Sequence, residues 1–281
     1  MSAMPDSPRD NGPMAASVGG PSGVVPHPAT TVCGSHISRA EVLIVEEYPL
    51  TVLFNDEELV TMLCSPGDER YLVLGFLASE GVIVSPAAIS RLEIDARNGL
   101  AWVETPDGRP GTPEKFLKRC LTACCGRGRA GLHFANDARL IHRVASRMRL
   151  TRKDIQRYAQ ILEDLSVTFH ATGGVHNGML FDDGLGICFF QDIGRHNVLD
   201  KLYGWCLDHD MAANNLVLSF SGRVSSEIVL KVSKMNLPVL IARSAPTSLA
   251  LALAEDLGIT VVGFARGQRC TVYTHAWRVL P

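Results

Sequence analysis

The chain has little surplus charge, few aromatic residues and no long apolar run. Lysine and arginine number 27 against 29 acidic residues, the formal net charge is −2, and 6% of residues are aromatic. Broad electrostatic attraction to nucleic acid or to an anionic membrane is therefore not expected. The longest segment without charge, 11–38, is rich in proline and glycine and lacks the apolar core of a membrane span.

Cysteine is also too sparse for a small secreted scaffold stabilised by disulfides. The 281 residues include 8 cysteines, of which only Cys120, Cys124 and Cys125 are clustered. No basic and apolar leader opens the chain. We therefore expect reduced cysteines and a cytoplasmic location.

The first part of the chain predicts a tail followed by a small mixed domain. Residues 1–38 contain no Phe, Trp or Tyr and offer little apolar surface, which predicts a disordered tail. Residues 39–115 predict an amino-terminal α+β domain, with a helix capped by Ser65 and ending near Gly81. Its expected strands are 41–46, 50–54, 59–63, 92–95 and 100–104, the last two joined through Asn98-Gly99.

The second part alternates strands and helices. A connector that carries the cysteine cluster, 116–149, leads to a domain at 150–281, which begins with an amphipathic helix. Alternation of this kind predicts an α/β sheet with parallel strands and with helices on its faces. The expected strands are 179–181, 187–190, 216–220, 239–242 and 260–264, and the later helices are 197–206, 225–235 and 247–257.

Small, hydroxylated and cationic side chains follow three of these strands. Carboxyl ends of parallel strands meet at one sheet edge, where helix N-termini and arginines can bind anions. In the alternative interpretation, the hydroxyls only cap helices and the arginines stay in water. The candidate residues are Ser221 and Arg223, then Arg243, Ser244 and Thr247, and then Phe264, Ala265, Arg266, Gly267, Gln268 and Arg269.

Two other segments are dense in polar groups next to glycine. They are 172–178, which contains His176, and 191–197, which contains Arg195 and His196. A helix start needs only one capping side chain, so this density favours a pocket. A lone histidine is more often structural, and only the neighbouring residues favour a pocket role for these two.

The cysteine cluster is the most distinctive chemical feature. Arg119, Arg127 and Arg129 surround Cys124 and Cys125, and nearby cations lower the pKa of a thiol and so favour the nucleophilic thiolate. Zinc bound by these cysteines and His133 is an alternative, but no CxxC pair supports it, and inert buried cysteines are another. We predict a reactive thiol and no bound metal.

Several short motifs follow one another along the chain. They are Ser65-Pro66-Gly67-Asp68, Leu74 to Ile83, Thr172 to His176, Asp192 to Asn197 with Asp200-Lys201, Ser221-Gly222-Arg223, Ser244 to Thr247, and Gly263-Phe264 with Thr271 to His275. In this order, from about Arg39 to Tyr273, they resemble the formate dehydrogenase accessory sulfurtransferases, the FdhD family of sulfur carriers.

The resemblance implies a function and a fold. A cysteine desulfurase would hand persulfide sulfur to this protein, a sulfurtransferase, which would pass it to a molybdenum bis(molybdopterin guanine dinucleotide) cofactor bound as a client for formate dehydrogenase. The family also implies a homodimer and a carboxy-terminal, three-layer domain with a mixed sheet, related to the cytidine deaminase fold. The family's cofactor-binding stretch corresponds to Phe264 to Arg269.

The chain departs from the family at the cysteine motif. Where the family has Cys-Gly-x-Cys-Gly, this chain reads Cys124-Cys125-Gly126-Arg127-Gly128. The Cys-Gly dipeptide selects Cys125, and the spacing to Leu132 selects Cys124. Because the second motif cysteine is missing, a non-catalytic chaperone that only binds the molybdenum cofactor is the alternative function. Deaminase chemistry is not expected, since Asn177 and Gly178 follow His176 and no H-x-E or later CxxC motif occurs.

Overall fold

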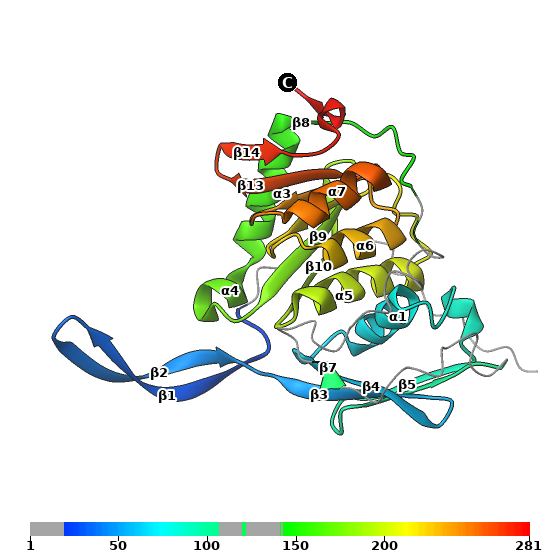
Figure 1. Cartoon of the computed structure of the whole chain (residues 1–281). Helices are drawn as coiled ribbons and strands as arrows, with labels where there is room; N and C mark the ends of the chain where they lie inside the picture. The colour runs from blue at the N-terminus through cyan, green and yellow to red at the C-terminus, as the bar shows by residue number, and fades with distance from the viewer. Residues whose placement is uncertain (1–19, 107–119, 122–140, 142) are drawn as a thin grey trace, which may run out of the picture.

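The computed structural model describes residues 20–106, 120–121, 141 and 143–281. They form a large mixed sheet with helices on both faces, a smaller sheet beside it, and a two-stranded arm that projects from the body (Figure 1). The architecture is mixed α/β, as predicted. In the described part of the chain, no helix is long and apolar enough to cross a membrane.

The arm replaces the last part of the predicted tail. Its strands, β1 (Val24–Cys33) and β2 (His36–Val45), pair antiparallel along their whole length. The prediction of a tail through residue 38 was therefore wrong for residues 24–38. The proline-rich composition concealed the β-branched residues of 24–32, whose pairing partner, 37–45, lies just across a turn.

The smaller sheet and one helix make up the amino-terminal unit. The sheet has the order β5-β6-β3-β4-β7, in which β3 and β4 form a hairpin through a turn at Asn55-Asp56. The edge strand β7 belongs to the segment predicted as a connector. The elements are β3 (Tyr48–Phe54), β4 (Glu57–Cys64), α1 (Glu69–Ser79), the short 3₁₀ helix η1 (Pro86–Ala88), β5 (Arg91–Asp95), β6 (Leu100–Glu104) and β7 (Cys120–Leu121).

Helix α1 begins later than its capping pattern suggested. Gly67 and Asp68 both have positive φ angles and make a turn, so the helix starts at Glu69. Ser65 is not the cap. Its hydroxyl instead accepts a hydrogen bond from the Ile193 N–H at 3.1 Å, which connects the amino-terminal unit to the larger sheet.

The larger sheet has the order β10-β9-β11-β12-β13-β14. Strands β11, β12 and β13 run parallel, as the alternation predicted, whereas β9, β10 and β14 run antiparallel to their neighbours. The elements after the connector are β8 (Leu150–Thr151), α3 (Arg152–Leu165), α4 (Val167–Thr172), β9 (His176–Asp182), β10 (Leu185–Asp192), α5 (Arg195–Asp208), β11 (Val217–Phe220), α6 (Ser226–Lys234), β12 (Val239–Ala242), α7 (Ser248–Leu257), β13 (Thr260–Arg266), β14 (Arg269–Val272), η2 (Ala276–Arg278) and β15 (Val279–Leu280).

Alternate residues of the central strands pack into two hydrophobic cores, one on each face of the larger sheet. Val217 and Ile241 pack against α3, whereas Leu218 and Leu240 pack against the helices of the other face. Helices α5, α6 and α7 cover that second face (Figure 1). A strand buried on both faces is apolar throughout, which is why these segments read as continuous apolar runs.

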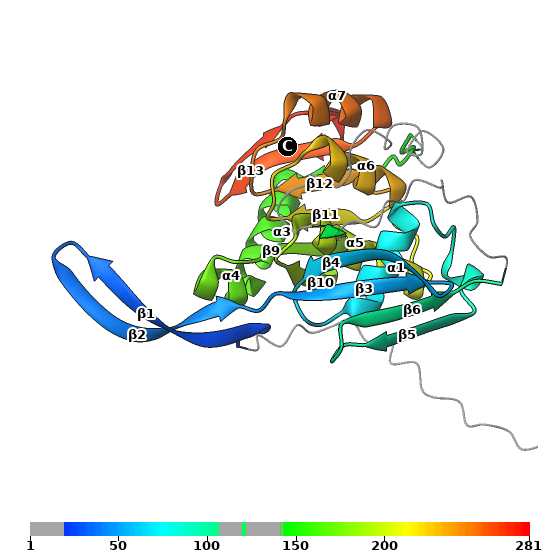
Figure 2. The same ribbon diagram turned by 60° about the horizontal axis from the view of Figure 1, so that its bottom comes forward.

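Two glycines bring the units together. An added Cβ on Gly75 of α1 would overlap the Asp200 carbonyl oxygen of α5, and one on Gly204 of α5 would overlap the Tyr71 carbonyl oxygen of α1. The two helices therefore cross with their backbones in contact. Figure 2 shows α1 between α5 and the smaller sheet. This crossing fixes the amino-terminal unit against the larger sheet.

Candidate functional site

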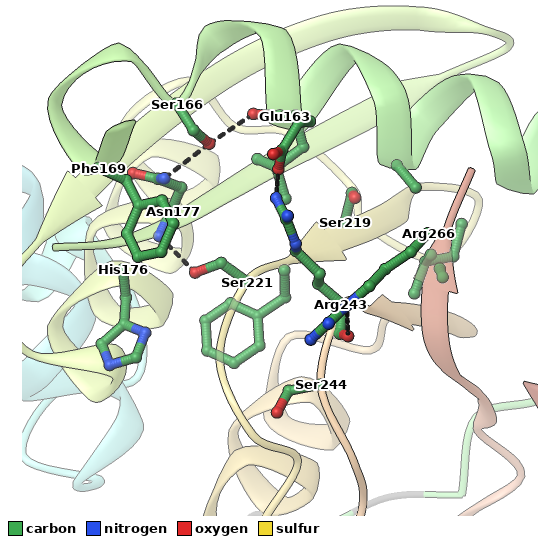
Figure 3. Close-up of a pocket in the computed structure, with 15 residues that line it drawn as sticks. Glu163, Ser166, Phe169, His176, Asn177, Ser219, Ser221, Arg243, Ser244 and Arg266 are labelled. Atoms are coloured by element: carbon green, nitrogen blue, oxygen red, sulfur yellow. Dashed lines mark hydrogen bonds and ion pairs between the residues drawn. The ribbon is translucent and has the colours of Figure 1, made fainter. Parts of the chain in front are cut away.

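A cavity of about 150 Å³ opens where β11, β12 and β13 end. Its polar walls come from these strand ends, from the start of β9 and from the last turn of α3 (Figure 3). Ser221 follows β11, and Arg243 and Ser244 follow β12. The parallel strands thus bring their carboxyl ends to one edge, as the sequence predicted.

Asn177 organises the inner wall. Its side chain is fully buried, and its Nδ2 donates to the Ser166 hydroxyl at 2.7 Å. Its backbone N–H donates to the Ser221 hydroxyl at 2.8 Å. Among the residues that the structure describes, none donates a hydrogen bond to the Asn177 Oδ1. A buried carbonyl oxygen without a partner is costly, so this wall presents an acceptor suited to an N–H donor of a ligand.

Two arginines make the cavity cationic. Arg243 forms an ion pair with Glu163 of α3, while Arg266 donates from Nε to the Arg243 carbonyl oxygen at 3.1 Å. Burial and the nearby Arg266 charge lower the pKa of the Arg243 guanidinium. Two positive charges facing one carboxylate leave a surplus that favours an anionic ligand.

His176 lies at the other side of the cavity and is held neutral. Burial first, and then the positive charge of Arg195, lower its pKa from the ordinary value. Arg195 does not line the cavity, although its charge contributes to the lowered pKa of His176. A neutral imidazole can donate or accept a hydrogen bond without adding charge.

The polar segment 191–197 serves mainly to join the two units. Asp192 is buried, accepts from Gly194 N–H and from Asn197 Nδ2, each at 2.8 Å, and lies 2.9 Å from Lys201 Nζ. His196 lies 3.1 Å from a Glu227 carboxylate oxygen and does not line the cavity. The density of polar groups in the sequence favours a pocket. In the structure, most of these groups instead form hydrogen bonds and an ion pair with the buried Asp192 carboxylate.

The remaining predicted residues lie outside the cavity lining, except Ala265. Thr247 caps α7 by accepting from Ala250 N–H at 3.3 Å, as in the alternative interpretation. Arg223 is exposed, and Phe264 has a φ of 51° and is also exposed. Gly267 and Gln268 form the turn between β13 and β14, and Arg269 begins β14, where it pairs in register with Arg266.

Three lining residues had no signal in the sequence. Glu163, Ser166 and Phe169 reach the cavity because α3 ends at Leu165 and α4 begins at Val167. In the sequence, Glu163 and Ser166 look like solvent-facing helical residues. Only the packing of α3 across the sheet shows that they reach the strand ends.

Cys124 and Cys125 lie outside the described residues. Three of the isolated cysteines are buried, and burial raises the pKa of the Cys64 and Cys206 thiols to about 12. Burial also raises the pKa of Cys188. A thiol with a raised pKa is a poor nucleophile, so these three cysteines are packing residues.

The arrangement defines a class of protein. It is a mixed α/β protein whose sheet edge offers two guanidinium groups, four serine hydroxyls and a buried amide to a ligand. Since a ligand pocket commonly encloses roughly 300–1,000 Å³, a cavity of this size admits one portion of a larger anion, such as a phosphate or a base edge.

Comparison with known proteins gives the family. The model of the FdhD/NarQ family matches residues 45–280, and the chain belongs to this family. The sulfur carrier protein FdhD of Geobacillus kaustophilus is 44% identical over 234 residues, which cover 83% of this chain and 89% of that protein. The sulfur carrier protein FdhD of Bacillus subtilis is 40% identical over 243 residues, covering 86% and 92% of the two chains.

A solved structure has the same fold. A crystal structure from Desulfotalea psychrophila, described as that of a candidate formate dehydrogenase accessory protein, superposes with a TM-score of 0.75 over 92% of this chain and 99% of that one. The two sequences are 22% identical, so this likeness concerns the fold alone. The family resemblance inferred from the order of the motifs is confirmed.

Proposed function

We propose that this protein carries sulfur for the maturation of formate dehydrogenase. The observation that carries the proposal is membership of the FdhD/NarQ family together with relatives that are named sulfur carriers and match 83% of the chain or more. In this proposal a cysteine desulfurase donates the sulfur, and a molybdenum bis(molybdopterin guanine dinucleotide) cofactor receives it as the client.

Cys125 or Cys124 is the proposed sulfur acceptor. Its thiolate attacks the outer sulfur of the desulfurase persulfide, the S–S bond of that persulfide breaks, and the desulfurase cysteine leaves as a thiolate. Delivery of the sulfur to molybdenum as sulfide consumes two electrons. A dithiol supplies them as it is oxidised to a disulfide, and the carrier cysteine returns as a thiol.

The cavity supports binding of the client through its guanine nucleotide portion. Arg243 and Arg266 offer charge-assisted hydrogen bonds to phosphate, and the Asn177 Oδ1 offers an acceptor to a ring or amino N–H of a base. The volume suits one portion of the cofactor, with the rest outside. The family resemblance adds three further proposals, namely a homodimer, a cytoplasmic location and a larger unit related to the cytidine deaminase fold.

Mass spectrometry tests the transfer step. Incubation with a cysteine desulfurase and free cysteine should add roughly 32 Da, the mass of one sulfur, to the wild-type chain. The gain should disappear in the Cys124→Ala/Cys125→Ala double variant and persist in Cys33→Ala, which removes an exposed thiol on the arm. Single variants then show which of the two cysteines accepts the sulfur.

Two outcomes contradict sulfur transfer by Cys124 or Cys125. An adduct that is absent from wild type supports the chaperone alternative, in which the protein only binds the cofactor. An adduct that is equally present in the double variant assigns the sulfur to another cysteine.

A further inference from the structure

The arm exposes apolar side chains that its own fold does not cover. Its two strands project away from both units (Figures 1 and 2), and Ile37 and Leu43 of β2 are 67% and 40% exposed. An isolated two-stranded ribbon is marginally stable in water, and three or more strands with an apolar face are needed for stability. A covering partner would supply that missing strand.

The hydrogen-bond phase of the ribbon identifies its available edge. Glu46 N–H donates to the Gly23 carbonyl oxygen at 2.8 Å, and the register pairs Val24 with Val45. Bonded pairs alternate along an antiparallel ladder. Even-numbered residues of β2 therefore face β1, whereas the odd-numbered residues 37, 39, 41 and 43 point their N–H and C=O groups outward. Among the described strands, β2 pairs with β1 alone.

The outer edge of β1 is unsuited to pairing. Pro26 and Pro28 occupy two of its outward positions, opposite Leu43 and Glu41. Proline has no N–H to donate, and it blocks the addition of a strand there. The edge of β2 contains no proline and keeps all its donors. An added strand therefore fits on β2.

The side chains of β2 are complementary to β2 itself in one antiparallel register. When Ala40 lies opposite the Ala40 of a second copy, Arg39 lies opposite Glu41, and Ile37 lies opposite Leu43, in both directions across the two-fold axis. Moving the two-fold axis by one residue, to Glu41 or to Arg39, shifts the two chains by two residues and places Glu41 opposite Glu41, or Arg39 opposite Arg39. Opposite charges and apolar pairs stabilise a sheet, whereas like charges destabilise it.

We propose that β2 pairs with β2 of a second copy about a two-fold axis at Ala40, forming a continuous four-stranded sheet from two arms. The occupant is a second copy because an isologous interface requires one self-complementary surface, which this register supplies. The inference rests on the homodimer proposed above and names the surface that forms it.

Charge reversal tests the register. Arg39→Glu and Glu41→Arg each place two pairs of like charges across the axis, so each variant should raise the dimer dissociation constant by at least about tenfold. An equimolar mixture of the two variants should recover dimers, because every Glu then faces an Arg. Glu58→Arg makes the same change on an exposed residue of β4 and should leave the dimer intact. Analytical ultracentrifugation of the full chain measures all four samples.

A cysteine placed at the axis gives an independent readout. Opposite residues in a non-hydrogen-bonded antiparallel pair have Cα atoms about 4.5 Å apart, within disulfide range. Mild oxidation of Ala40→Cys should therefore produce a covalent dimer above the background of the native cysteines. Ala29→Cys, which lies on β1 opposite Ala40, should not exceed that background.

The outcomes separate this inference from the homodimer itself. A wild-type chain that sediments as a monomer overturns both. If wild type is a dimer but the charge-reversal variants remain dimers of equal affinity, the homodimer stands and the arm is not its interface. Loss in each variant with recovery in the mixture establishes the register.

Discussion

At the scale of single residues, the cavity makes Arg266 the most direct test of the client site. Its guanidinium lies at the mouth, beside Arg243, and can approach a phosphate without breaking an ion pair to Glu163. Replacing Arg266 with Ala should weaken binding of guanosine diphosphate by about 1.5 kcal/mol. This is the lower end of the range for a hydrogen bond to a charged group, and we expect it because Arg266 is exposed. Isothermal titration calorimetry measures the change.

The matched control is Arg223→Ala. Arg223 is exposed, follows β11 and does not line the cavity, so its loss should leave the affinity unchanged. The sequence alone grouped both arginines at the binding edge. Equal losses in the two variants would place the nucleotide across the outer edge instead of in the cavity.

Three of the cavity residues that the sequence identified, Ser221, Arg243 and Ser244, follow a strand directly. Ser221 and Ser244 reach the cavity because the chain leaves parallel strands there, and strands are visible as apolar runs. Glu163 and Ser166 depend on how a helix crosses the sheet, which no local pattern specifies. The same limit explains why Asp192 and Asn197 looked like pocket residues. Asp192 accepts from the Ser65 N–H and Asn197 donates to the Leu63 carbonyl oxygen, and both partners are far away in the sequence.

At the scale of elements, the crossing of α1 and α5 depends on two glycines. Gly75→Ala inserts a methyl group onto the Asp200 carbonyl oxygen, which is backbone and cannot rotate away. Overpacking of a tight core typically costs about 1–3 kcal/mol, and we expect a loss at the upper end of that range for Gly75→Ala. Urea unfolding followed by circular dichroism measures the free energy of unfolding.

Gly20→Ala controls for the general effect of replacing glycine. Gly20 is exposed, and no atom lies within 4 Å of an added Cβ. The free energy of unfolding of the Gly20→Ala variant should therefore stay within about 0.5 kcal/mol of wild type. If Gly75→Ala were equally silent, α1 and α5 would be free to move apart and would not fix the two units.

The elements differ in how far adjacent residues alone determine them. Strand β12 was predicted at its observed bounds, and α6 and α7 were predicted to within one residue at each end, because apolar periodicity and caps depend on adjacent residues. The amphipathic helix expected at the start of the second domain is α3. The first strand of the arm was missed because Pro26 and Pro28 interrupt its β-branched residues, and because its pairing partner lies across a turn, as far along the chain as Val45. Strand β14 was missed because its sequence, Arg269 to Val272, has no buried face of its own.

At the scale of the whole molecule, a buried ion pair of the larger unit accepts a hydrogen bond from the smaller unit. Asp192 and Lys201 are 0% and 1% exposed, and the Asp192 carboxylate also accepts from Ser65 N–H at 3.2 Å, next to β4. Removing one partner leaves a buried charge uncompensated, which costs about 3–5 kcal/mol. The same few atoms therefore hold both units, and neither should unfold alone.

This coupling predicts one cooperative unfolding transition, which the chain's three tryptophans can report. A chain that keeps only Trp102 reports β6 of the smaller sheet, and one that keeps only Trp205 reports α5, where this indole stacks on His209 at 4.5 Å. Urea midpoints from the two fluorescence signals should coincide, and Lys201→Met should lower both equally. Two separated midpoints, or a shift in only one, would show that the units are stable independently and that the contacts of Gly75 and Asp192 do not bind them into a single folding unit.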